Sequence, residues 1–401
     1  MTAMRWLTLI GIGEDGRDGL SPAATRLIAQ AHFIIGGARH LALLGKADAE
    51  TMAWPSPFAD GIKEILDRRG KNVCVLASGD PFLYGVGPLL AAKIPAEEMI
   101  CLPAPSSLSL AAARLGWALQ DCEIVSLHGR PFERIIPHLR PNAKLLVLCW
   151  DGETPQRLAE LLRMRRLGRS RMIVLEALGG PREKLSDMYA GDFTQRVIDP
   201  LNLVAIEVKA DSDAIWIPLT PGLPDDYFET DGQITKREIR ALTLSALAPW
   251  PGACLWDVGA GSGSISIEWM LANPGNCAFA IEAREDRAAR IVRNATALGV
   301  PDLVVTAGRA PEIFRQLPEP DAIFIGGGGA DVIDAAYETL ASGRIMVVNA
   351  VTIETQSLVA ARHAQYGGQL TMIDIAHAEP LGTFRGWVKT RPIVQWAVTK
   401  R

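Results

Sequence analysis

The sequence lacks the features that mark exported, membrane-spanning and nucleic-acid-binding proteins. Its six cysteines lie far apart and form no Cys-X-X-Cys pair, so we expect reduced thiols and no metal site. No apolar run approaches the roughly 18 residues of a membrane helix, and no cleavage site follows the short apolar run at the N-terminus. A net charge of -4 supplies no field for nucleic acid or anionic lipid. These absences favour a cytoplasmic protein that binds neither membranes nor nucleic acids.

The length and composition indicate two domains. A chain of 401 residues exceeds what one hydrophobic core usually serves, and 48% of its residues are hydrophobic. The stretch 211–229 is rich in Pro, Asp and Gly, a composition typical of loops. We therefore predict a domain at 1–210, a linker at 211–229 and a second domain at 230–401.

Short apolar runs alternate with helical stretches in both halves. Continuous apolar runs favour strands buried on both faces, so we predict an α/β fold in each half, with a doubly wound sheet and an antiparallel end in the second. The strands expected in the first half are 7–12, 33–36, 73–77, 122–127, 145–149, 172–175 and 203–208. Those expected in the second half are 254–258, 278–281, 303–307, 322–325, 344–349, 370–378 and 394–399.

The most informative local pattern places Gly259, Gly261 and Gly263 at alternate positions directly after an apolar strand. Such glycines let the backbone turn tightly and approach a ligand closely. Without a partner acid, a purely structural turn would be an equal alternative. Glu282, however, ends the next apolar strand about 20 residues on, where a carboxylate can accept hydrogen bonds from both hydroxyls of a ribose. The pattern therefore predicts a nucleotide site, and the GxGxG spacing favours S-adenosylmethionine over a dinucleotide.

Other patterns in the second half have both a functional and a structural interpretation. Thr235 and Glu238 have the spacing of a capping box with Thr235 as N-cap, and helix capping alone would explain them. The four glycines at 326–329 follow an apolar strand and leave room for a large flat substrate, with a flexible loop as the alternative. Asn349 and Thr352 follow the next strand and are expected to face the same crevice, although a turn role would also explain Asn349.

In the first half, Ser78, Gly79 and Asp80 precede Pro81 at the end of the strand predicted at 73–77. A local explanation suffices for this turn, because Gly relaxes the backbone, Asp bonds to it and Pro fixes φ. His128 and Arg130 follow another strand and could meet substrate carboxylates, although a His beside a turn is often structural.

The second half resembles a known family. Its residues 234–240, 257–263, 308–312, 325–329 and 348–355 are similar to the precorrin C15-methyltransferase and decarboxylase family of the cobalamin pathway, and the similarity covers essentially all of 230–401. The resemblance implies a Rossmann-like domain that binds S-adenosylmethionine. It places Thr235 against the cofactor, Glu282 at the ribose, Ala310 beside the adenine, and Gly259, Ala260, Gly261, Ser262 and Gly263 around the methionine portion. Glu282 and Ser262 stand where that family often has Asp and Thr, and both changes keep the required oxygen.

The first half resembles the tetrapyrrole methylase family, in the branch that methylates C5 of a precorrin. The similarity rests on residues 11–13, 77–85, 103–111 and 126–130 and covers about 5–210. It implies a two-lobed α/β fold that clamps a folded cofactor between loops. Those loops supply Ser78, Gly79, Asp80, Ser106 and Ser107. The chain departs from the family pattern after Gly13, where it has Glu14, Asp15 and Gly16 and many relatives have Pro-Gly.

Together the two resemblances imply an enzyme with one S-adenosylmethionine site per domain. It would methylate precorrin-6B at C5 and C15 and remove the carboxyl group of the C12 acetate, giving precorrin-8. Direct methyl transfer needs no covalent intermediate, so no catalytic residue is assigned. A methyltransferase with another substrate and a non-catalytic corrinoid carrier are the alternatives, and relatives of both halves imply a homo-oligomer.

The acetates and propionates of such a substrate call for basic side chains at the rim of the site. Taken alone, each basic candidate is more often a solvated surface charge. The substrate-binding candidates are Arg130, Lys236, Arg237, Gly327, Gly328, Arg344, Asn349 and Arg385.

Overall fold

The computed structural model describes residues 5–194 and 196–401, which form two compact units. The first unit combines the chain up to Arg130 with Arg140–Ile215, and the second combines Pro131–Leu139 with Trp216–Arg401. The boundary after Ile215 falls inside the stretch expected to be a linker. The sequence did not indicate that Pro131–Leu139 would join the second unit.

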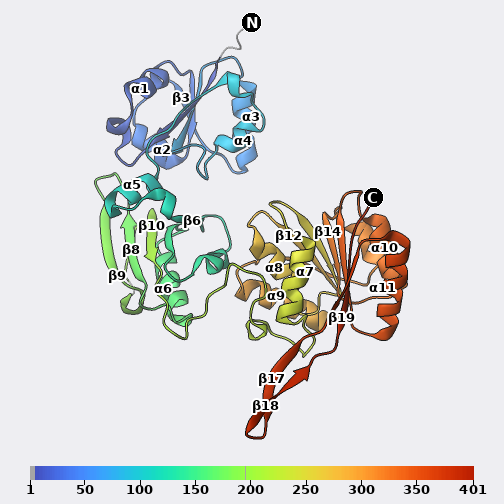
Figure 1. Cartoon of the computed structure of the whole chain (residues 1–401). Coiled ribbons are helices and arrows are strands. Elements are labelled where there is room, and N and C mark those ends of the chain that lie inside the picture. Colours follow the sequence, from blue (N-terminus) through green and yellow to red (C-terminus); the bar gives the residue numbers. More distant parts are fainter. Residues whose placement is uncertain (1–4, 195) are drawn as a thin grey trace. The chain divides into compact units, whose positions relative to one another are not determined.

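The first lobe of unit 1 is a parallel sheet with helices along it (Figure 1). Its strand order is β3-β2-β4-β1-β5. The strands are β1 (Leu7–Ile12), β2 (Phe33–Gly36), β3 (Glu50–Ala53), β4 (Val73–Ser78) and β5 (Met99–Leu102), and the helices are α1 (Pro22–Ala29), α2 (Ala38–Leu44), α3 (Phe58–Asp67) and α4 (Gly87–Ala91). The three inner strands were predicted from sequence. The outer strands β3 and β5 were missed, because each has four partly exposed residues and no fully buried apolar run.

The second lobe of unit 1 is a mixed sheet in the order β6-β7-β10-β8-β9. Only the pair β6 and β7 is parallel. The elements are α5 (Ser107–Leu115), β6 (Glu123–Ser126), β7 (Lys144–Leu148), α6 (Thr154–Met164), β8 (Arg171–Glu176), β9 (Lys184–Tyr189) and β10 (Asn202–Glu207). The edge strand β9 was missed, because its residues are exposed or half-buried.

Unit 2 contains the predicted doubly wound sheet, in the order β13-β12-β11-β14-β15-β19-β16. Its strands are β11 (Cys254–Val258), β12 (Cys277–Glu282), β13 (Val304–Ala307), β14 (Ala322–Ile325), β15 (Ile345–Ala350), β16 (Gln369–Ile373) and β19 (Ile393–Thr399). Helices α7 (Arg237–Leu247), α8 (Ser264–Ala272) and α9 (Glu285–Ala297) lie along one face, and α10 (Ala330–Thr339) and α11 (Ile353–Tyr366) along the other (Figure 1). The antiparallel end is confirmed, because β19 runs against both β15 and β16.

The single strand expected at 370–378 is wrong. Strand β16 ends at Ile373, and β17 (Ala376–Leu381) pairs with β18 (Phe384–Lys389) in a separate two-stranded sheet. Gly382, with a φ of +61°, lies in the two-residue loop between them, as tight hairpins require. This hairpin projects from the body of the unit (Figure 1).

Much of the predicted linker packs against unit 2. The buried guanidinium of Arg240 on α7 donates to Glu268 on α8, with Nε 2.5 Å from Oε1, and to Asp225, with Nη1 3.1 Å from Oδ1. Glu268 also accepts from the amides of Gly222 and Leu223, at 2.6 and 2.9 Å. These buried charges are paired and hydrogen-bonded, as burial requires. The segment from Gly222 to Asp225 is therefore part of the second fold and not a free tether.

The segment Pro131–Leu139 is held to unit 2 at the end of α9. Arg134 forms an ion pair with Asp302, with 2.7 Å between Nη2 and Oδ2. Gly299 lies against Pro137 so closely that a Cβ there would come within 2.4 Å of the proline ring. In the part of the chain that the structure describes, no helix is long and apolar enough to cross a membrane.

Candidate active sites

The glycine turn after β11 has the backbone conformation that glycine permits. Gly259, Gly261 and Gly263 have φ values of +75°, +60° and +76°, in a region that other residues rarely adopt. Gly263 is also crowded, because a Cβ there would lie 2.7 Å from the Ile291 side chain. Residues of other types at these positions would strain or displace the turn.

Glu282, at the end of β12, is hydrogen-bonded to this turn. One carboxylate oxygen accepts from the amide of Gly261 at 2.9 Å, and the other accepts from the amide of Arg284 at 3.0 Å. A carboxylate offers about four acceptor positions, so both oxygens keep a lone pair. The arrangement fits the two ribose hydroxyls of S-adenosylmethionine.

Asp257, one residue from the end of β11, is a site residue that the sequence reasoning did not select. Its side chain is buried, and Oδ2 accepts from the amide and hydroxyl of Ser266 at 3.1 and 2.5 Å. Among the residues that the structure describes, Asp257 Oδ1 has no hydrogen-bond partner, and neither has the buried hydroxyl of Ser262 in the turn. Burial raises the pKa of Asp257 to about 6, the Ser266 hydrogen bonds oppose this rise, and the negative charge of Glu282 adds to it. Its position directly before the glycine turn was the available signal.

The segment before α7 also reaches the turn, but it does so without the expected capping box. The helix begins at Arg237 with Lys236 as N-cap and no side-chain cap, so the assignment of Thr235 as N-cap is wrong. The carbonyl of Thr235 instead accepts from Arg240 at 2.5 Å. The carbonyl of Gln233 lies 3.6 Å from where a Cβ on Gly261 would be, which places this segment beside the turn.

Two further predicted elements lie at the same edge of the sheet. The amide of Gly326 donates to Val258 at 3.0 Å, and a Cβ on Gly259 would lie 3.4 Å from the Gly327 nitrogen. No atom lies within 4 Å of a Cβ built on Gly327, so the space there is open. On the other side, the amide of Gly308 donates to the carbonyl of Glu282 at 3.1 Å, and this holds the loop that carries Ala310.

Several proposed substrate residues lie elsewhere. Arg344 precedes β15 and therefore lies at the amino edge of the sheet, opposite the glycine turn, where it pairs with Asp321 at 2.9 Å. Arg385 lies on the hairpin strand β18. Lys236 remains beside the turn segment but pairs with Asp225 at 3.5 Å. The position of Arg344 does not support the prediction that it binds substrate at the rim of the site.

Asn349 had been expected to follow its strand, but it lies within β15. Its Nδ2 donates to Thr243 Oγ1 at 2.8 Å, and its Oδ1 accepts from Gln395 at 3.0 Å. This buried network explains Asn349 without a ligand. Thr352 is the N-cap of α11 and accepts from the Thr355 amide at 3.3 Å.

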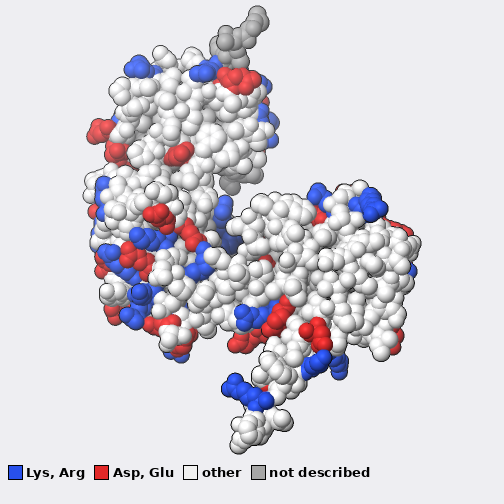
Figure 2. Space-filling view, in the orientation of Figure 1, with Lys and Arg blue, Asp and Glu red and all other residues white. Residues whose placement is uncertain are grey.

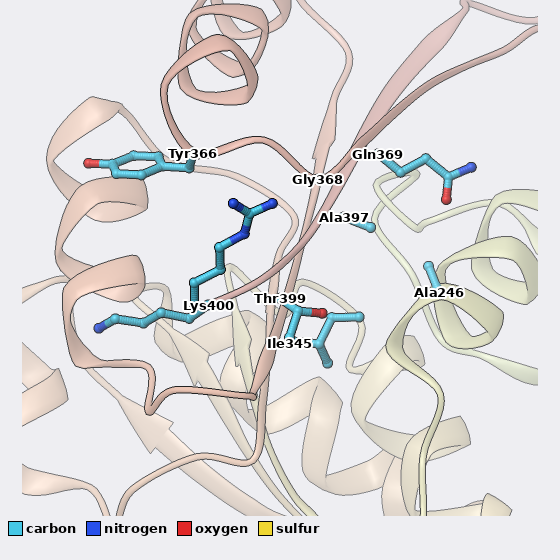
Figure 3. Close-up of a pocket in the computed structure, with 9 residues that line it drawn as sticks. Ala246, Ile345, Tyr366, Gly368, Gln369, Ala397, Thr399 and Lys400 are labelled. Carbon is cyan, nitrogen blue, oxygen red and sulfur yellow. The ribbon is translucent and has the colours of Figure 1, made fainter.

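The pocket in Figure 3 is also at the amino edge of the sheet. It is lined in part by Ile345, which begins β15, by Thr399, which ends the antiparallel β19, and by Ala246 on α7. None of the predicted site residues lines it.

In unit 1, the predicted loops meet at the carboxyl ends of β1 and β4. A Cβ on Gly11 would lie 1.8 Å from the carbonyl oxygen of Gly79 and 2.4 Å from the Ala104 nitrogen. Gly79 has a φ of +50°, and a Cβ there would lie 2.9 Å from the Cα of Ser106. These glycines are needed because three backbone segments cross in contact.

The polar residues of these loops have local partners. Asp80 accepts from the amide of Phe82 at 2.8 Å, and Ser106 caps α5 by accepting from the amide of Ser109 at 3.2 Å. Ser107, the first residue of that helix, is exposed. The Asp80 contact matches the local explanation that the sequence left open for the Gly-Asp-Pro turn.

Ser78 gathers two side chains that sequence reasoning missed. Arg39 Nη2 donates to its hydroxyl at 2.8 Å, and His40 Nε2 lies 2.8 Å from the same oxygen. Arg39 also pairs with Glu14 in the loop after β1. Burial, followed by the positive charge of Arg39, lowers the pKa of His40 to about 4. The signal was the position of both residues just after the strand Phe33–Gly36.

Known proteins resemble both units. Residues 6–192 match the family model of tetrapyrrole (corrin/porphyrin) methylases, and residues 226–400 match that of the precorrin methyltransferase domain. The precorrin-6Y C(5,15)-methyltransferase (decarboxylating) of Sinorhizobium sp is 54% identical over 98% of this chain and 96% of that protein. A probable cobalt-precorrin-6B C(15)-methyltransferase (decarboxylating) of Pyrobaculum calidifontis is 35% identical over 44% of this chain and 95% of its own length.

Among solved structures, the C-terminal domain of precorrin-6Y C5,15-methyltransferase from Rhodobacter capsulatus shares 49% identity. The match covers 46% of this chain and 100% of the Rhodobacter chain, with a TM-score of 0.44. The near full-length identity to the Sinorhizobium protein, together with the match of one family model to each half, shows that the chain belongs to the precorrin-6Y C(5,15)-methyltransferase (decarboxylating) family.

Proposed function

We propose that this chain transfers methyl groups from S-adenosylmethionine to C5 and C15 of precorrin-6B and removes the carboxyl group of the C12 acetate, giving precorrin-8. The observation that supports the proposal is that each unit contains parallel neighbouring strands whose carboxyl ends carry the predicted loops, and α/β sheets bind ligands at that edge. Two methyl transfers to different carbons call for two such sites. We assign one cofactor to each.

We assign C5 methylation to residues 1–210 and C15 methylation with decarboxylation to residues 230–401. The first half matches the tetrapyrrole methylases, which leaves the second chemistry to the second half. The Pyrobaculum relative is named for C(15) methylation and decarboxylation alone, and it aligns with only 44% of this chain. The name of this relative therefore assigns C(15) methylation and decarboxylation to a protein that aligns with less than half of this chain.

In unit 2, the surface beside the cofactor turn suits a large ring. Gly327 leaves open space at the end of β14, and Val351 and Ile353, just beyond β15, are 44% and 78% exposed. Since β14 and β15 are parallel neighbours, these residues lie at the same edge of the sheet. Methyl transfer in line from the sulfonium then depends on alignment of the ring carbon with the methyl group.

Product analysis tests the assignment. The full chain, precorrin-6B and labelled S-adenosylmethionine should give a ring with two labelled methyl groups and one carboxyl group lost, by mass spectrometry. Asp80→Ala should yield a ring that is decarboxylated and methylated at C15 but lacks the C5 methyl. If that variant instead loses decarboxylation and keeps C5 methylation, the two halves are reversed.

We also propose that the enzyme is a homo-oligomer joined through the hairpin of β17 and β18. Leu381, Phe384 and Trp387 on it are 68%, 79% and 77% exposed, and the uncharged end of the hairpin has a basic patch beside it (Figure 2). Pro380 interrupts the edge of β17, so β18 is the edge open to a second copy, and a two-fold axis would bury the same residues on both. Light scattering should show an oligomer, and Trp387→Arg should dissociate it; a wild-type monomer would refute this.

We place the enzyme in the cytoplasm, where its six free cysteines would stay reduced. The strand register places Cys254 and Cys277 side by side on β11 and β12, so an oxidising compartment would expose two neighbouring thiols to disulfide formation. Fractionation of cells should recover the enzyme with its thiols free.

A further inference from the structure

Four side chains at the carboxyl edge of the unit 1 strands form two stacked pairs. Arg130 lies over the ring of Tyr84, with the guanidinium carbon 5.0 Å from the ring centre. The rings of His128 and Trp150 stack with 5.4 Å between centroids and 30° between planes. His128 and Arg130 are two residues apart on one loop, so the pairs adjoin; we call these four residues the aromatic ledge.

The ledge exposes its aromatic rings to solvent. Tyr84 and Trp150 are 49% and 55% exposed, and His128 and Arg130 are exposed as well. Large aromatic side chains usually gain their stabilisation from burial. Half-exposed rings held in pairs from separate loops therefore offer contact surface for a ligand.

The backbone of Tyr84 is strained in a way that burial does not compensate. Its φ is +51°, a conformation that is an outlier for a bulky residue and costs about 1 to 3 kcal/mol. The loop around it is tightly coiled, since the Gly87 amide donates to the Pro81 carbonyl at 2.8 Å and a Cβ on Gly85 would lie 2.5 Å from that oxygen. A loop that holds an exposed Tyr in this conformation presents the ring to something outside the fold.

The ledge adjoins the loop proposed to hold the cofactor. Tyr84 lies in the loop after β4 together with Gly79 and Asp80, and Ser78 is the last residue of that strand. His128 and Arg130 follow β6, and Trp150 follows β7. Since β6 and β7 are parallel neighbours, their loops emerge at one edge, and the contact of Tyr84 with Arg130 joins this edge to the first lobe.

We propose that Tyr84, His128, Arg130 and Trp150 bind the tetrapyrrole in the N-terminal site and position it for methylation at C5. This rests on the function proposed above for the first unit. The faces of Tyr84 and Trp150 contact the apolar face of the ring, and Arg130 binds a peripheral acetate or propionate. S-adenosylmethionine is a poorer fit for this surface, because its sulfonium is repelled by Arg130 and its single adenine cannot cover side chains from three loops.

The test uses the full chain with precorrin-6B and measures KM for each substrate in C5 methylation. Trp150→Ala and Arg130→Gln should each raise KM for precorrin-6B about 10-fold, a loss typical of one stacking or charged contact, and leave KM for S-adenosylmethionine unchanged. Trp150→Phe, which keeps an aromatic face, should recover most of the loss. Under limiting precorrin-6B, the Ala and Gln variants should accumulate a decarboxylated ring that carries the C15 methyl and lacks the C5 methyl.

Tyr84→Gly separates binding from folding. Glycine accepts the φ of +51° without strain, so the melting temperature should stay level or rise while KM for precorrin-6B increases. Tyr189→Ala is the matched control, because Tyr189 is 57% exposed on the distant edge strand β9, and it should change neither KM.

Each remaining outcome decides against the proposal. If the wild type methylates C5 and the ledge variants keep its KM for precorrin-6B, or raise KM for S-adenosylmethionine instead, the ledge does not bind the ring. The same holds if Tyr189→Ala matches the ledge variants, or if Tyr84→Gly loses activity only together with its fold. If the wild type makes no C5-methylated product, the proposed function fails and this proposal fails with it.

Discussion

Asp257→Asn should remove a pH-dependent loss of stability from the second unit. Burial raises the pKa of Asp257 from 3.8 to about 6, so the folded state keeps its proton to higher pH than the unfolded chain. The stability that Asp257 contributes is therefore greatest below pH 3.8, its pKa in the unfolded chain. It is lost as the pH rises through about 6, its pKa in the folded state. The pKa difference of about two units corresponds to about 3 kcal/mol, of which about 2 to 3 kcal/mol should disappear between about pH 4 and pH 8.

Asparagine carries no charge at any of these pH values and can still accept from the Ser266 amide. The variant should match the wild type near pH 4 and be more stable near pH 8. The gain is reduced because the two Ser266 hydrogen bonds no longer have a charged acceptor, so we expect a net gain of about 1 to 2 kcal/mol. Hydrogen exchange followed by mass spectrometry in peptides from β11 and α8, corrected for the intrinsic pH dependence, measures the opening free energy of this region.

A difference between variant and wild type that is the same at both ends of the pH range would refute the reasoning. It would mean that Asp257 is ionised in the fold at all these pH values, with a partner for its Oδ1 atom. Peptides from unit 1 serve as the internal control, because they should show no difference between the two proteins.

Three further outcomes follow from other contacts. Glu282→Ala removes a charged hydrogen-bond acceptor that contributes about 1.5 to 3 kcal/mol to binding. Calorimetry should therefore show an affinity for S-adenosylmethionine at the C-terminal site that is about 10- to 150-fold lower, while C5 methylation survives. Unchanged affinity would exclude Glu282 from the site. Gly11→Ala would place a Cβ 1.8 Å from the Gly79 oxygen and should destabilise unit 1 by more than about 4 kcal/mol, seen as proteolysis of that unit alone, whereas Gly327→Ala, with open space around it, should be as resistant as the wild type. A fragment starting at Trp216 should fold alone, decarboxylate and methylate C15, and should be more stable than one starting at Thr230, which lacks the buried Leu223 and Phe228; equal stability would mean that these residues do not belong to the second fold.

The sequence predicted most of the inner strands to within a residue or two, because a strand covered on both faces must be continuously apolar. It missed β3, β5, β9 and β18, because edge and hairpin strands have one exposed side and need no such run. Glycines with a demanding backbone conformation were also visible in the sequence: the turn Gly259, Gly261 and Gly263 has positive φ throughout, as its spacing indicated.

By itself, the sequence determined the order of the elements, the glycine turn and the acid at the end of the following strand, because these depend on short-range periodicity and on backbone freedom. Only the tertiary structure decided the contacts between distant segments. Asn349 was drawn into a buried network by Thr243 and Gln395, which lie 106 and 46 residues away. Tyr84 and Trp150 were brought beside one loop by the packing of separate strands. Local patterns record what a residue permits, whereas the partner that satisfies a buried amide or covers an exposed ring is chosen by the fold as a whole.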